Sequence, residues 1–191
     1  MAKTYGGIRH VGVVNQSEYA INKAIFELEL ASGNYNIEKS YLSPSGAYVL
    51  LEKGHQYHED EMEAAIAMAD SGIIVRLEKE GDPSRATRVD EWGNYKFSEG
   101  TLSIERLTYE QSTRTFITTT AEKSVKKALE HAKDKGSEIC VIYDKGGLFH
   151  RSDIQAGIRL YERFRTNDNH RFKAILVIDQ HHNVYEWTHD K

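Results

Sequence analysis

The chain has 191 residues, of which 39% are hydrophobic and 28% are charged, and its formal net charge is −4 at pH 7. These values are typical of a globular domain that buries its own core. The negative balance argues against a nonspecific coat for nucleic acid but leaves room for a local basic patch. A single cysteine, Cys140, excludes an intrachain disulfide, and no run approaches the roughly 20 apolar residues of a membrane span.

The first part of the chain predicts strands that alternate with helices. We expect a strand over 8–14, a helix to about Ala31, a strand over 47–51, a helix over 59–70 and a strand over 73–77. Four acids open the second helix, where negative charge suits the helix dipole. Apolar residues at helical spacing form the expected face of the first helix: Ile21, Ala24, Ile25 and Leu28.

The middle of the chain changes to an antiparallel pattern. A hairpin is expected over 88–97 around a two-residue turn at 93–94. The apolar alternation then changes phase near 105–106, which indicates a bulge or a short break. The next helix, 120–135, begins with a predicted capping box of Thr119 and Glu122.

The last third predicts buried strands around one more helix. The run 139–143 is apolar throughout, so we expect it to be buried on both faces. A helix over 152–165 and strands over 172–178 and 184–187 follow. The whole order predicts an α+β (mixed α/β) single domain, in which about four helices pack on a central, mostly antiparallel sheet.

Nine histidines raise the question of a metal site. His55 and His58 are three residues apart, and His181 and His182 are adjacent. Neither pair is accompanied by paired cysteines or by an HExxH motif. We therefore predict solvated loop histidines and no metal. Because phosphate-binding and dinucleotide-binding glycine motifs are also absent, we predict no cofactor.

A metal-dependent nuclease is a weaker possibility. Its pattern is an aspartate followed on a strand by Glu-x-Lys, and here Asp90 is followed by Glu110. Ser112 stands where the lysine that positions the attacking water is expected, so the match is incomplete.

The densest set of reactive groups lies at 109–115 and on the helix that follows. Metal-free RNA cleavage needs a base for the 2′-hydroxyl, an acid for the 5′-oxygen and a group that stabilises charge on phosphorus. We predict the catalytic residues Glu110, His131 and Thr113, and the substrate-binding residues Gln111, Arg114, Thr115 and Lys135. In the alternative interpretation, Glu110 only pairs with Arg114 and His131 is a helix-surface residue.

Two segments carry a family resemblance. Residues 45–49 with 61–75, and residues 109–115 with 124–136, resemble the C-terminal tRNase-type toxin domain of contact-dependent inhibition CdiA proteins and its phage and mobile-element relatives. These are grouped with the barnase/EndoU/colicin/RelE-like RNases. The resemblance covers about 44–191 as an RNase-like domain, and leaves 1–43 as an N-terminal, βαβ-like elaboration.

The resemblance implies a metal-independent endoribonuclease toxin, with tRNA-like RNA and an immunity protein as partners. The single cysteine and the lack of a signal or membrane-spanning segment predict a cytoplasmic protein without membrane contact. The missing lysine and the negative net charge leave a second hypothesis open, a noncatalytic module that binds nucleic acid or protein. A metal-dependent nuclease is the third.

Overall fold

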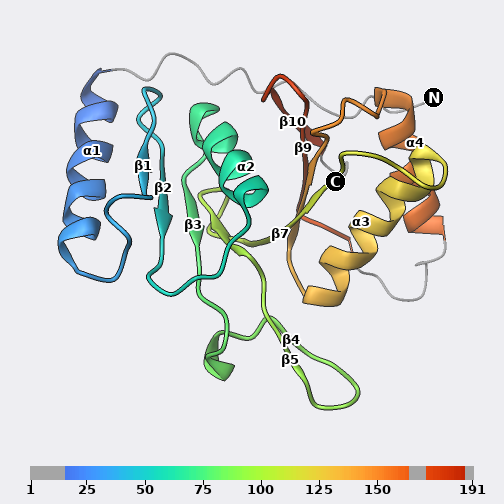
Figure 1. Cartoon of the computed structure of the whole chain (residues 1–191), viewed down its shortest axis with the longest axis horizontal. Coiled ribbons are helices and arrows are strands. Elements are labelled where there is room, and N and C mark those ends of the chain that lie inside the picture. The colour runs from blue at the N-terminus through green and yellow to red at the C-terminus, as the bar shows by residue number, and fades with distance from the viewer. Residues whose placement is uncertain (1–15, 164–170, 188–191) are drawn as a thin grey trace.

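The computed structural model describes residues 16–163 and 171–187, and its main feature is an eight-stranded mixed sheet with helices on both faces (Figure 1). The helices are α1 (Gln16–Ala31), α2 (Glu59–Asp70), α3 (Ala121–Lys135) and α4 (Arg151–Arg163), and a 3-10 turn covers Pro83–Arg85. The strands of the sheet are β1 (Tyr41–Leu42), β2 (Tyr48–Leu51), β3 (Val75–Leu77), β6 (Gly100–Leu102), β7 (Thr108–Thr113), β8 (Ile139–Tyr143), β9 (Ala174–Ile178) and β10 (Val184–Trp187). The strand predicted over 8–14 lies outside the described residues.

Strand β7 is where the sheet changes from antiparallel to parallel pairing. The strands run in the order β1-β2-β3-β6-β7-β8-β9-β10. Strands β3, β6 and β7 form an antiparallel meander, whereas β7, β8 and β9 are parallel. Four of the seven pairings are antiparallel, which confirms the predicted α+β class.

Alternate residues of β8 serve two separate cores. Ile139, Val141 and Tyr143 belong to the core beneath α2. Cys140 and Ile142 pack in the core beneath α3 and α4. Period-two alternation of side chains across a strand explains this division, and it confirms that β8 is buried on both faces. In the described part of the chain, no helix combines the length and the apolar character needed to cross a bilayer.

The apolar face predicted for α1 is wrong. Leu28 is 74% exposed, and Ile21 and Ile25 are also exposed. The helix instead buries Phe26 against Tyr48 of β2, with the ring centroids 5.3 Å apart. Because α1 lies at the margin of the sheet (Figure 1), it has only a narrow surface to cover.

Two local predictions also need correction. Thr120, not Thr119, caps α3, because its side chain accepts a hydrogen bond from the N–H of Lys123. The hairpin of β4 (Arg88–Val89) and β5 (Tyr95–Lys96) forms as expected, but the Val89–Tyr95 pairing leaves five residues in its loop rather than two. The phase change near 105–106 is a tight turn in which both residues have positive φ.

The stripe predicted on α3 gives a stability test. Leu129 is fully buried against the strands below α3, so Leu129→Ala should lower the free energy of unfolding by about 2–5 kcal/mol. Leu28→Ala removes the same atoms from an exposed position and should change it by less than about 0.5 kcal/mol. Chemical denaturation measures both, and equal losses would contradict this packing.

Candidate metal and phosphodiester site

Two glutamates from neighbouring strands meet where β6 begins. Gly100 pairs with Tyr109, so Glu99 lies opposite Glu110 on β7. The backbone N–H of Glu99 donates to Oε2 of Glu110 at 3.1 Å. Both residues are buried, with exposed fractions of 8% and 6%. The antiparallel register therefore forces two carboxyl groups together in a poorly solvated place.

Helix α2 adds a third carboxylate to this pair. Oε2 of Glu61 accepts from the backbone N–H of His58 at 3.1 Å, which fixes the side chain in the first turn of the helix. Its neighbours Asp60 and Glu63 turn away and pair with Lys145. Of the four acids that open α2, Glu61 thus faces Glu99, and Asp60 and Glu63 form a separate ion-pair network.

His55 completes the cluster from the loop that precedes α2. Its Nε2 lies 3.8 Å from Glu61 and 3.9 Å from Glu99. One ligand atom from each of these three residues lies within 4.8 Å of the other two. That spacing suits three donors around one cation.

His55 is not the solvated loop histidine that we expected. Its side chain is 3% exposed, and a parallel ring, Tyr57, lies 6.3 Å away between centroids. Neither ring nitrogen has a hydrogen-bond partner among residues 16–163 and 171–187. Buried imidazole nitrogens normally bond to a partner, so this ring offers an unused donor or lone pair to the cluster.

These groups line an open pocket of about 220 Å³. Lys135 brings a cation to it from the last turn of α3, and its Nζ lies 3.8 Å from Glu80. The lining residues are Gly54, His55, Gln56, Glu61, Glu80, Glu99, Glu110 and Lys135. The lining therefore combines four glutamates with a single lysine, Lys135.

The crowding of acids changes their protonation. Burial, the negative charge of Glu110 and the contact with Glu61 raise the pKa of Glu99 to about 10, while Lys135 acts in the opposite direction. Burial also acts to raise the pKa of Glu61, but contacts with His55, with Glu99 and with the N–H of His58 leave it below the usual range. At neutral pH Glu99 therefore holds a proton that a bound cation would displace.

The structure brings Glu110 and His131 together, as the sequence suggested. Nε2 of His131 lies 3.1 Å from Oε1 of Glu110. The His131 side chain is 48% exposed and that of Glu110 only 7%, so the imidazole is far more accessible to solvent than the carboxylate. Glu110 pairs with His131 rather than with Arg114, and Lys135 lines the same pocket. The catalytic roles predicted for Glu110 and His131 stay predictions.

The other predicted site residues lie elsewhere. The amide of Gln111 donates to the Thr113 hydroxyl at 2.8 Å, on the face of β7 that is covered by α2. Nε of Arg114 donates to Ser124 at the start of α3, and Thr115 is exposed. None of these four side chains lines the pocket that contains Glu110. Alternation along β7 explains the separation, because Gln111 and Thr113 face away from Glu110.

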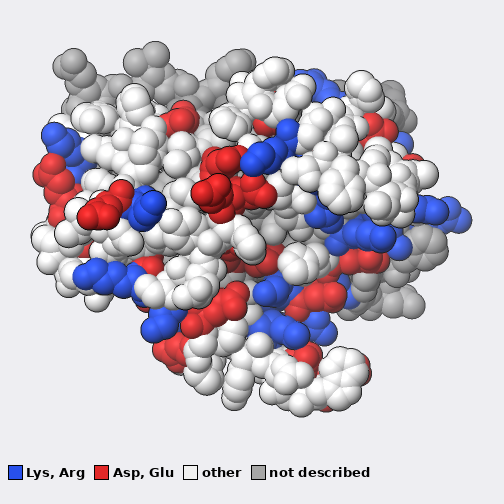
Figure 2. All heavy atoms as spheres, viewed as in Figure 1, with Lys and Arg blue, Asp and Glu red and all other residues white. Residues whose placement is uncertain are grey.

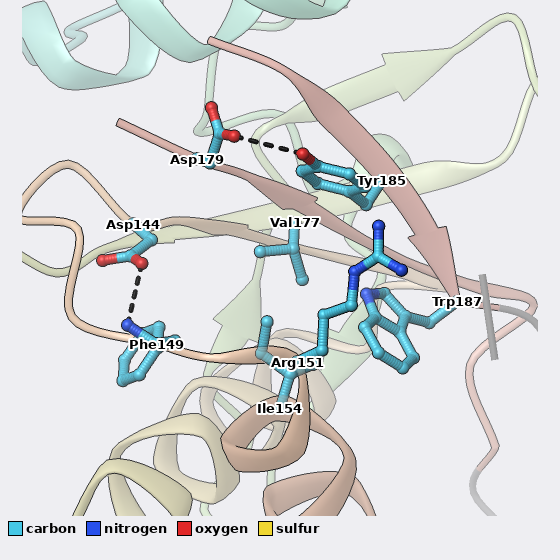
Figure 3. Close-up of a pocket in the computed structure, with 8 residues that line it drawn as sticks. All are labelled: Asp144, Phe149, Arg151, Ile154, Val177, Asp179, Tyr185 and Trp187. Atoms are coloured by element: carbon cyan, nitrogen blue, oxygen red, sulfur yellow. Dashed lines mark hydrogen bonds between the residues drawn. The ribbon is translucent and has the colours of Figure 1, made fainter. Parts of the chain in front are cut away.

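A second pocket, of about 140 Å³, lies at the carboxyl ends of β8 and β9 (Figure 3). Asp144 accepts hydrogen bonds from the N–H groups of Leu148 and Phe149. Asp179 accepts from the Tyr185 hydroxyl, and the guanidinium of Arg151 lies 5.5 Å from the centre of the Tyr185 ring. Both carboxylates of this second pocket already accept hydrogen bonds from neighbouring loop and strand groups. We therefore place the candidate site at the first pocket, which contains Glu99 and Glu110.

Sequence reasoning missed three members of the cluster. It paired Asp90 with Glu110, whereas Asp90 lies in the hairpin loop and accepts from the N–H groups of Trp92 and Asn94. Glu99 takes the place beside Glu110, and Glu61 and His55 join it from α2 and its loop. The register of β6 against β7 is the signal that would have identified Glu99.

Comparisons of the sequence and of the fold with known proteins identify no family for this chain. No family model matches the sequence, and no curated protein matches it. Among solved structures, the chain is similar to the CdiA-CT/CdiI toxin and immunity complex from Burkholderia pseudomallei, with 14% identity over 73% of this chain and 98% of that chain. The TM-score is 0.48, and nothing about activity or partners follows from a likeness at that level.

The raised pKa of Glu99 predicts a pH-dependent stability. Between the ordinary carboxyl pKa of 4.5 and about 10, the folded chain keeps a proton that the unfolded chain releases. The free energy of unfolding should therefore fall as the pH rises through this window.

Glu99→Gln should flatten that decline, because the amide is neutral at every pH. The control Glu138→Gln removes an exposed carboxylate and should keep the wild-type slope. Denaturant titrations from about pH 5 to about pH 9 measure the slopes, and identical slopes for wild type and Glu99→Gln would contradict the assignment.

Proposed function

We propose that this protein is a metal-dependent nuclease whose site is the acidic pocket between α2, β6, β7 and α3. The observation that carries the proposal is the close grouping of His55, Glu61 and Glu99 around one point, with Glu110 beside them. The unpartnered, buried imidazole of His55 supports it further. We favour this assignment over metal-free cleavage because three possible ligand atoms converge on one point and the buried imidazole among them has no other partner.

The donor set suits a small divalent cation. Carboxylate oxygens are the preferred ligands of Mg²⁺ and Mn²⁺, and Mn²⁺ also accepts imidazole. Glu61, Glu99 and His55 would hold such an ion, and Glu110 provides a further carboxylate in the pocket. A bound divalent ion polarises a phosphoryl oxygen and lowers the pKa of water.

Lys135 is the lining residue suited to a phosphodiester substrate. Water attacks phosphorus, the bond to one ester oxygen breaks, and that oxygen leaves with a proton. Lys135 is placed to contact a phosphate oxygen from α3. It supplies the cation that the Glu-x-Lys pattern would have placed at Ser112 on β7.

A metal test addresses this proposal directly. With single-stranded RNA, DNA and tRNA as substrates, cleavage should require Mg²⁺ or Mn²⁺ and should stop in EDTA. Glu99→Gln should lower the rate by at least about a hundredfold, and Glu138→Gln should leave it unchanged. Mn²⁺ should raise the melting temperature of the wild type but not that of Glu99→Gln. Full activity in EDTA, or no cleavage with any metal or substrate, would refute the proposal.

The 3.1 Å contact between Glu110 and His131 favours a second candidate, a metal-independent ribonuclease. In that reaction the 2′-hydroxyl oxygen attacks phosphorus, and the 5′-oxygen leaves as a protonated hydroxyl. For this second candidate, the predicted substrate is the tRNA-like RNA that the family resemblance implies, and the predicted protein partner is an immunity protein.

Products and mutants distinguish the two candidates. Metal-independent cleavage leaves 2′,3′-cyclic phosphate ends in EDTA, which liquid chromatography with mass spectrometry identifies. If Glu110 and His131 act as one unit, each alanine variant should lose most activity and the double variant little more. Losses that multiply independently would instead indicate two separate contacts.

A further inference from the structure

The β4–β5 hairpin carries an exposed aromatic surface beside the candidate site. It projects from the body of the molecule (Figure 1). Trp92 is 77% exposed, and the cross-strand partners Val89 and Tyr95 are about half exposed. Large apolar side chains gathered on a projecting element are typical of a binding surface rather than of a core.

The tip of the hairpin is held in a fixed shape. The carboxylate of Asp90 accepts hydrogen bonds from the N–H groups of Trp92 and Asn94 and from the Asn94 amide. Gly93 has a φ of 82°, which closes the turn. Because the loop is fixed in this way, the backbone of Trp92 has little conformational freedom left to lose on binding.

The root of the hairpin is attached to the pocket itself. The Thr87 hydroxyl donates to the backbone carbonyl of Lys135, and Arg88 donates to the carbonyl of Asp134. Lys135 lines the acidic pocket, and its partner Glu80 lies in the segment that leads into the hairpin. A chain bound in the pocket therefore passes close to the hairpin root.

The far end of the hairpin offers aromatic rings rather than charge. Basic and acidic side chains lie side by side where the hairpin leaves the body, and its far end is mostly uncharged (Figure 2). Near the root the cross-strand partners Arg88 and Lys96 are each paired with an acid, Arg88 with Asp134 and Lys96 with Asp90.

We propose that the hairpin is a platform for single-stranded nucleic acid, in which bases stack on Trp92 and Tyr95 while a neighbouring phosphodiester occupies the acidic pocket. This inference rests on the proposed function and names how its substrate is held. Aromatic side chains stack on any unpaired base, so the platform selects single strands over duplexes rather than a particular sequence.

Binding in EDTA separates this inference from catalysis. The probes are labelled oligonucleotides of about 15 nucleotides, one of DNA and one of 2′-O-methyl RNA, neither of which can form a 2′,3′-cyclic phosphate. Fluorescence anisotropy should show that Trp92→Ala raises the Kd roughly tenfold for both, whereas Trp92→Phe keeps most of the affinity. A duplex of the same sequence should bind weakly and should not respond to Trp92→Ala.

Phe116 provides the matched control. It is 72% exposed and precedes the first turn of α3, whereas the hairpin packs on the last turn, about 20 Å away along the helix. Phe116→Ala should leave the Kd unchanged. Equal affinity of wild type and Trp92→Ala for both oligonucleotides would overturn the inference. Binding that depends on Trp92 without any cleavage would support the platform and refute the nuclease proposal alone.

Discussion

The constraint on which the site depends is the forced proximity of Glu99, Glu110 and Glu61. Antiparallel pairing of β6 with β7 places the first two opposite each other, and α2 points the third at them. Like charges in a poorly solvated place cannot all ionise, so Glu99 retains a proton, with a pKa near 10. That proton relieves the repulsion among the three acids, and in the proposed metal site a divalent cation would take its place.

The arrangement of the sheet and its helices places this acidic cluster at an open pocket. Strand β7 is antiparallel to β6 and parallel to β8, so helices α2 and α3 both pack near it, on different faces. The first turn of α2 and the last turn of α3 therefore contribute Glu61 and Lys135 to one hollow. Glu61 also accepts the N–H of His58, so the residue that helps to cap α2 is one of the acids of the site.

Much of the fold could be predicted from the sequence, but the site could be predicted only in part. Helix 59–70 and strands 139–143 and 184–187 match their predicted bounds, because buried runs and helical spacing are local signals. The spacing in α1 misled us, because its apolar face has no partner surface among the described residues. Glu99 and His55 belong to segments without periodicity, and only strand register and loop packing bring them to Glu110. Glu110 and His131 were predictable because α3 runs back along β7.

The contacts of Glu110 distinguish the roles available to it. Both of its oxygens are engaged, one by the Glu99 N–H and one by His131, and the residue is 6% exposed. A general base needs a free lone pair within reach of the proton it removes, so in a metal-free reaction the half-exposed His131 is better placed than Glu110 to exchange protons with substrate and solvent. A carboxylate that is hydrogen-bonded at both oxygens is better suited to provide a fixed negative charge beside a cation. The geometry of Glu110 therefore favours an electrostatic role for this carboxylate over the role of general base.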